Sequence, residues 1–119
     1  MEINELLGKV LTSVDASDEE VLFTCSDGSA YKMFHYQDCC ESVYVEDING
    51  DLSDLVEAPI LQAEEVTSHE NLPGVKPEWQ DESYTWTFYK LATIKGSVTI
   101  RWYGTSNGYY SEGVDFEEI

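Results

Sequence analysis

The sequence is poor in cations. Its 119 residues include 6 Lys and Arg against 24 Asp and Glu, which gives a formal net charge of -18. A nucleic-acid-binding domain needs a basic stripe that neutralises phosphates, and six scattered cations do not supply one. An anionic membrane surface would repel so acidic a chain. We therefore predict no direct binding to nucleic acid and no membrane association.

Long apolar runs and paired cysteines are also lacking. No uncharged apolar stretch approaches the roughly 18 residues that span a bilayer. The first residues lack the cationic and apolar regions of a secretory signal, so we expect none. The three cysteines, Cys25, Cys39 and Cys40, are an odd number, and adjacent cysteines rarely bridge because the ring is strained. These absences predict a reduced, cytoplasmic location.

What the chain does contain is apolar and aromatic residues, at 42% and 13% of the sequence. That content is too high for an acidic disordered tail. A chain of this length buries enough surface for one hydrophobic core. No internal repeat or change of composition divides it, so we expect a single domain over residues 1–119.

Alternation of apolar and polar residues with period two predicts a mainly β (α+β) fold. We expect a twisted antiparallel sheet of about six or seven strands with one or two short helices. The β-prone runs are residues 10–14, 21–25, 31–36, 42–48, 60–67, 83–93, 97–103 and 109–116, and the helical turns are residues 2–7 and 51–56.

Several local details follow from this pattern. A turn at residues 26–29 should fold the second run onto the third, and residues 109–116 should form a third antiparallel strand after the hairpin of residues 83–103. In residues 42–48, strict alternation places Ile48 on the face opposite Val43 and Val45. The loop of residues 68–82 is long enough for a functional role, such as ligand binding.

Two segments carry potential metal ligands. Asp47, Asn49 and Asp51 have the spacing of calcium ligands, but Leu52 and Ala58 stand where an EF-hand needs Gly and Glu. A strand-to-helix turn capped by Asp51 is therefore the preferred interpretation.

The second segment contains His35, Cys39 and Cys40, to which the first hairpin would bring Cys25. One nitrogen and several sulfurs can bind zinc, but adjacent cysteines differ from the CxxC spacing of zinc sites. Packed free cysteines and a solvated or hydrogen-bonded histidine are favoured, with a metal site as the alternative. We predict no cofactor.

Catalytic motifs are also absent from the sequence. Neither His35 nor His69 lies near a nucleophile in a recognisable turn, and there is no glycine-rich phosphate loop. We therefore predict that the protein is not an enzyme.

The unusual property is the distribution of charge. Residues 38–82 hold thirteen acids and one base, a net charge of -12 from 13 minus 1. Alternate strand residues are roughly 6 to 7 Å apart, close to the spacing of phosphates along a nucleic-acid strand. Eighteen charges correspond to roughly 30 Å of duplex, comparable with the diameter of such a domain. The predicted partner-binding acids are Glu46, Asp47, Asp51, Asp54, Glu57, Glu64 and Glu65.

Three segments resemble a family of small acidic uncharacterised proteins from bacteriophages and prophages. They are EDINGDLSDL from Glu46, YTWTFYKLATIKG from Tyr84, and TIRWYGTSNGYYSEGVDF from Thr99. The resemblance covers about the last two thirds of the chain and implies a phage setting. Phages use small acidic proteins, some of which imitate DNA, against restriction and CRISPR enzymes.

Together, charge and resemblance predict a phage-encoded, non-enzymatic inhibitor of a host defence enzyme. The expected partner is a host protein with a basic nucleic-acid-binding groove, in the cytoplasm of the bacterial host. The alternative is a small phage accessory or ligand-binding domain whose acidity serves only solubility. A free sheet edge makes a dimer possible.

Overall fold

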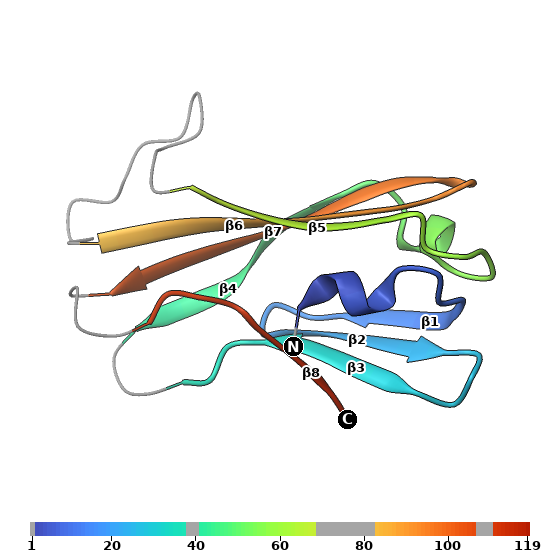
Figure 1. Cartoon of the computed structure of the whole chain (residues 1–119). Helices are drawn as coiled ribbons and strands as arrows, with labels where there is room; N and C mark the ends of the chain where they lie inside the picture. Colours follow the sequence, from blue (N-terminus) through green and yellow to red (C-terminus); the bar gives the residue numbers. More distant parts are fainter. Residues whose placement is uncertain (1, 38–40, 69–82, 107–110) are drawn as a thin grey trace.

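The computed structural model describes residues 2–37, 41–68, 83–106 and 111–119 (Figure 1). These residues form eight strands and two single turns of 3-10 helix. The strands are β1 (Leu11–Ala16), β2 (Glu20–Cys25), β3 (Ala30–Phe34), β4 (Ser42–Asn49), β5 (Gln62–Ser68), β6 (Ser83–Thr93), β7 (Gly96–Ser106) and β8 (Asp115–Glu118). The helical turns are η1 (Ile3–Leu6) and η2 (Leu52–Leu55).

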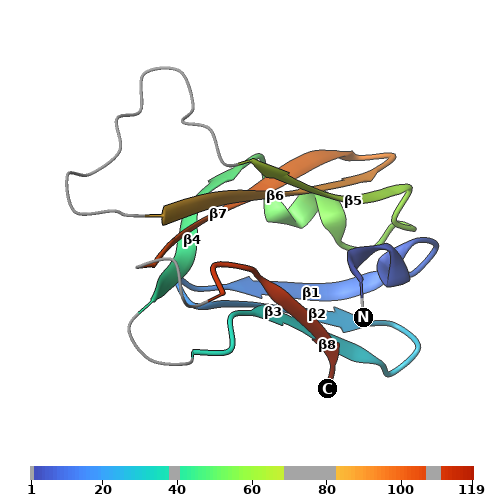
Figure 2. The ribbon, with the colours of Figure 1, turned by 60° about the vertical axis from the view of Figure 1, so that its left-hand side comes forward.

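The strands form two antiparallel four-stranded sheets, in the orders β1-β2-β3-β8 and β4-β7-β6-β5. The predicted mainly β class is confirmed, whereas the prediction of one sheet with six or seven strands is wrong. The predicted helices are only 3-10 turns of four residues each. Figure 2 shows the sheets as two layers. Each sheet is apolar on one face, and stacking two such faces removes both from water.

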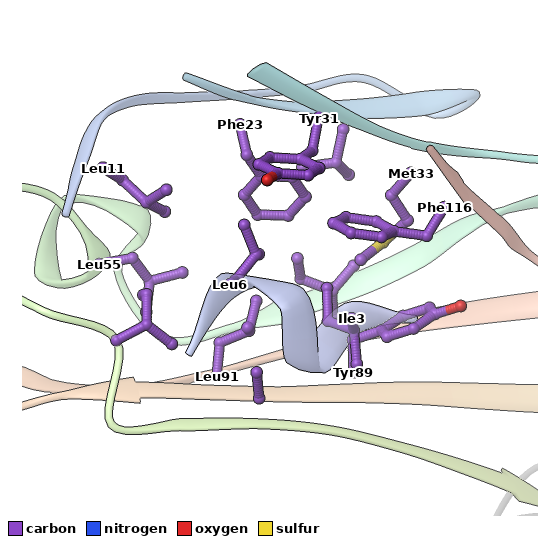
Figure 3. Packing of buried hydrophobic residues seen from close by; sticks show 14 of the residues in the cluster. Ile3, Leu6, Leu11, Phe23, Tyr31, Met33, Leu55, Tyr89, Leu91 and Phe116 are labelled. Carbon is purple, nitrogen blue, oxygen red and sulfur yellow. The ribbon is translucent and has the colours of Figure 1, made fainter. Parts of the chain in front are cut away.

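The core lies between the layers. Phe23 and Met33 of the first sheet and Leu91 and Trp102 of the second are fully buried. The Trp102 indole N–H also points at Met33 Sδ, 3.1 Å away, across the gap between the sheets. Figure 3 shows Leu6 of η1 reaching into this space, so η1 fills one side of the sandwich.

Strand β8 belongs to a different sheet from the one predicted. It pairs with β3, in the register Met33↔Phe116, and not with β7. Phe116 stacks on Tyr31, with ring centroids 5.4 Å apart. Burial of this aromatic ring in the first sheet accounts for the crossover. Residues 107–110, on which the predicted turn and strand start fall, lie outside the described residues.

Both predicted hairpins are confirmed. Strand β2 folds back onto β3 with Phe23 opposite Tyr31. Strands β6 and β7 pair over eleven positions, from Ser83↔Ser106 to Thr93↔Gly96.

No helix among the described residues has the length and apolar character needed to cross a membrane.

Strand β4 departs from strict alternation. Its register with β7 shifts between Val45 and Asp47, as in a β-bulge. The extra residue changes the phase of the strand, so Ile48 pairs with Ile100 and packs against the core. The predicted outward position of Ile48 is therefore wrong.

The predicted turn at residues 51–56 is confirmed, and so is its cap. The Asp51 carboxylate accepts hydrogen bonds from the Ser53 backbone N–H at 3.0 Å and the Ser53 hydroxyl at 2.7 Å. These bonds lower the pKa of Asp51. Asp51 thus serves as the N-cap of η2.

Gly50 precedes this cap and makes a close backbone approach. Its φ is 117°, and a Cβ atom there would lie 2.6 Å from the Ser97 carbonyl oxygen. We expect Gly50→Ala to lower the free energy of unfolding by about 2 kcal/mol, because it adds a clash to an unfavourable backbone conformation. Urea denaturation measures the loss. Gly28→Ala is the control, since φ is 90° there but the space is open; equal losses for both variants would contradict the clash.

Candidate functional site

The structure separates the seven predicted partner-binding acids into three groups. Glu46 and Asp47 lie on β4. Asp51, Asp54 and Glu57 lie in or beside η2, and Glu64 and Glu65 lie on β5. Because β4 and β5 are the opposite edges of their sheet, the first and third groups are not neighbours.

The β4 acids have other neighbours that the sequence did not suggest. The Val45 N–H donates to the Asp18 carbonyl oxygen at 2.7 Å, which joins β4 to the turn between β1 and β2. Asp18, Glu46 and Asp47 line a hollow of about 310 Å³ at this junction. Glu19 lines a second hollow, of about 390 Å³, beside it. We call Asp18, Glu19, Glu46 and Asp47 the acidic ridge.

One cation lies against the acidic ridge. The Arg101 Nε donates to a Glu46 carboxylate oxygen, and a terminal nitrogen of Arg101 lies 3.7 Å from Asp47. The bulge lets both adjacent acids reach this guanidinium, which regular alternation would not allow. Four carboxylates and one guanidinium leave the ridge and Arg101 together with a net charge of -3.

Aromatic side chains adjoin the acidic ridge on the outer face of the second sheet. The Tyr103 ring contacts Tyr44 and Trp86, with centroid distances of 6.1 and 4.4 Å. The Arg101 guanidinium lies 5.4 Å from the Trp86 ring centre. Tyr44 is 38% exposed, whereas Trp86 is buried.

A buried polar cluster lies beside the second hollow. The His35 ring Nδ1 lies 2.7 Å from the Gly113 carbonyl oxygen, and Nε2 lies 2.9 Å from a Glu41 carboxylate oxygen. A carbonyl oxygen only accepts, so Nδ1 donates. The side chains of His35 and Glu41 are 4% and 0% exposed. The cluster ties the end of β3 to the start of β4 and to the segment before β8.

Neither metal site considered from the sequence, the calcium site or the His/Cys zinc site, has a ligand cluster in the described residues. Within that part of the chain, no three His, Cys, Asp or Glu side chains come together as metal ligands. Both ring nitrogens of His35 already have oxygen neighbours, while Cys39 and Cys40 lie outside the described residues. The calcium alternative loses two ligands, because Asp47 contacts Arg101 and Asp51 caps η2.

The acids of β5 point to opposite faces. Glu64 is paired in register with Lys90, whereas Glu65 lies opposite Tyr89. The Tyr89 hydroxyl donates to Glu65 at 3.4 Å. Partial burial raises the pKa of Glu65, and the nearby Glu2 carboxylate adds to the rise. Burial also raises the pKa of Tyr89, so its hydroxyl stays protonated.

We expect Glu65→Gln to stabilise the fold at neutral pH by about 0.5 kcal/mol, a small gain because the side chain is still largely solvated. A carboxyl whose pKa is raised on folding opposes stability once the pH rises above its unfolded value, near 4.5. The gain should therefore disappear below about pH 4. Thermal unfolding across pH measures it. Glu64→Gln, which removes an exposed charge opposite Lys90, should give no gain at any pH.

These features define the class of the protein as a two-sheet antiparallel β domain with an acidic ridge at the junction of its sheets. The chain belongs to the family described as "Domain of unknown function (DUF7448)", whose model matches residues 4–116. Searches of curated proteins and of solved structures found no significant match.

Proposed function

We propose that this protein is a phage-encoded, non-enzymatic inhibitor of a host defence enzyme, a CRISPR or restriction nuclease, in the bacterial cytoplasm. Its acidic ridge occupies the basic groove in which that enzyme binds nucleic acid. The ridge takes the place of phosphates, and the neighbouring aromatic side chains add contact area.

The observation that carries this proposal is the joining of Asp18 and Glu19 to Glu46 and Asp47 by the contact between Val45 and Asp18. It brings the two acids of the β1–β2 turn to the edge of β4, where Glu46 and Asp47 contact the Arg101 guanidinium. Such a concentration of one sign of charge speeds association with a basic surface and makes it dependent on salt. The phage resemblance of the sequence supplies the biological setting.

A second candidate function rests on the acids outside the ridge. Those on η2 and β5 are spread over other parts of the surface, and Glu64 lies opposite Lys90. This spread fits a small phage accessory domain whose charge serves solubility. In that case the acidic ridge would have no special role among the charges of the molecule.

Capture from a bacterial lysate tests the proposed function. The immobilised chain is incubated with lysate at about 0.05 M and about 0.5 M salt, where screening lengths differ roughly threefold. We expect nucleic-acid-binding proteins to be retained at low salt and released at high salt. Retention that is independent of salt, or of proteins without a nucleic-acid site, would contradict the proposal.

A further inference from the structure

The first hollow at the junction of the sheets has an apolar floor and an acidic rim. It measures about 310 Å³ and is lined by the end of β1, the β1–β2 turn and the bulged part of β4. Val45 and Ile48 are half-buried and pack against the core, so they form the floor. Asp18, Glu46 and Asp47 are exposed and form the rim. The hollow therefore suits a side chain with an apolar stem and a charged head.

Hydrogen bonds hold the two sides of the hollow in place. The Val45 N–H donates to the Asp18 carbonyl oxygen at 2.7 Å, which joins the sides. Within the turn, the Ser17 N–H donates to the Glu20 carbonyl oxygen at 2.8 Å, and the Ser17 hydroxyl accepts from the Glu20 N–H at 3.2 Å. A surface that is already ordered loses little conformational freedom when a ligand binds.

The charge around the hollow is almost entirely negative. Strands β1, β2, β4 and β7 and the β1–β2 turn contain one cation, Arg101, and six acids: Asp15, Asp18, Glu19, Glu20, Glu46 and Asp47. Their net charge is -5, from 1 minus 6. On β3, the strand beyond β2, the Lys32 ammonium lies over the Phe34 ring, 4.3 Å from its centre. The field at the hollow therefore favours a cationic ligand.

Arg101 shows how these carboxylates hold a guanidinium. It donates to Glu46, lies 3.7 Å from Asp47, and has the Trp86 ring 5.4 Å away. The Asp18 side chain, which lines the hollow from the turn, has no hydrogen bond or ion pair within the described part of the chain. A guanidinium carries five donors in a planar fork and can bridge two carboxylates, whereas an ammonium is a point charge. Arginine therefore fits the rim better than lysine.

We propose that this hollow binds one arginine side chain of the partner protein. The methylene stem lies on Val45 and Ile48, and the guanidinium lies between Asp18 and the acids of β4. This inference rests on the proposed function, because it names the group of the basic groove that the acidic ridge receives. The volume of about 310 Å³ is at the lower end of the roughly 300 to 1,000 Å³ of ligand pockets, which suits a single side chain. Arginines anchored in such pockets are typical hot spots of interfaces.

Titration with the blocked tripeptide acetyl-Gly-Arg-Gly-amide tests the proposal on the isolated protein. NMR of the Val45 methyl groups reports occupation of the hollow. We expect saturable shifts, with an affinity at least roughly threefold above that of the lysine analogue. The citrulline analogue, which keeps the shape of arginine without its charge, should not bind. Equal binding of the arginine and lysine peptides would overturn the proposal, because charge alone would then explain the contact.

Two substitutions locate the site. Ala16→Phe fills the hollow without changing the charge and should weaken binding of the arginine peptide at least roughly fivefold. Thr12→Phe is the control, because Thr12 is exposed on the same strand but does not line the hollow. Asp18→Asn tests the rim without adding bulk and should weaken binding roughly threefold, with Glu64→Gln as the control of equal charge. Equal binding by each variant and its control would overturn the proposal.

The same variants separate this proposal from the proposed function. Ala16→Phe keeps the net charge of -18, so its capture of nucleic-acid-binding proteins depends on the acidic field alone. If the peptide does not bind but capture at low salt succeeds, the arginine site is refuted and the proposed function stands. If the peptide binds in the hollow and no nucleic-acid-binding protein is captured, the arginine site stands and the proposed function is refuted.

Discussion

Replacing Glu41 with alanine is expected to lower the free energy of unfolding by about 3 kcal/mol. The Glu41 side chain is fully buried; one carboxylate oxygen lies 2.9 Å from His35 Nε2, and the other accepts from Gln37 Nε2 at 3.0 Å. Alanine leaves the buried ring nitrogen of His35 facing a cavity, and an unsatisfied buried polar group is costly. Because a domain of this kind is stable by only about 5 to 15 kcal/mol, the loss is a large share of the total.

Urea denaturation with an unchanged m-value measures this loss. Glu41→Gln keeps an oxygen acceptor in a side chain of the same shape, so it should cost less than half as much. Glu64→Ala removes an exposed carboxylate and should change stability by less than about 0.5 kcal/mol. If Glu41→Ala were as stable as Glu64→Ala, the buried cluster would not stabilise the junction between the end of β3, the start of β4 and the segment before β8.

Neutralising the acidic ridge is expected to slow association with the captured partner by roughly 10- to 100-fold at low salt. The variant carries Asp18→Asn, Glu19→Gln, Glu46→Gln and Asp47→Asn. Amide oxygens still accept hydrogen bonds from Arg101, so the fold is retained while the charge is removed. Stopped-flow mixing with the purified partner at several salt concentrations measures the association rate.

A matched variant distinguishes the ridge from the overall charge. It carries Glu5→Gln, Glu57→Gln, Glu64→Gln and Glu118→Gln, all exposed and all away from the ridge. Both variants have a formal net charge of -14, from -18 plus 4. We expect the matched variant to associate almost as fast as the wild type. Equal slowing of both variants would favour the solubility interpretation.

Local structure was largely predictable from the sequence. The hairpins, the turn after Gly50 and its Asp51 cap depend on residues close together in the chain, where alternation and turn chemistry act directly. The assignment of strands to sheets was not. Whether Phe116 would pack beside Met33 or continue the β6–β7 hairpin depends on contacts between distant residues, which alternation alone does not specify.

The candidate site shows the same limit. Counting acids along the chain identified Glu46 and Asp47 but missed Asp18 and Glu19, which reach them only through the packing of the β1–β2 turn against β4. The consecutive acids Asp18 and Glu19, in a turn that links two strands, were the signal that could have indicated them. The bulge that directs Glu46 and Asp47 toward Arg101 breaks the very alternation used to predict the strand.

Competition with DNA for the captured partner tests the central claim most directly. The partner is loaded with a fluorescent duplex, and the release of the duplex is followed by anisotropy as the protein is added. The account predicts stoichiometric release by the wild type and by the matched variant, and none by the ridge variant at the same concentration. A ternary complex in which the partner holds both the duplex and this protein would contradict it.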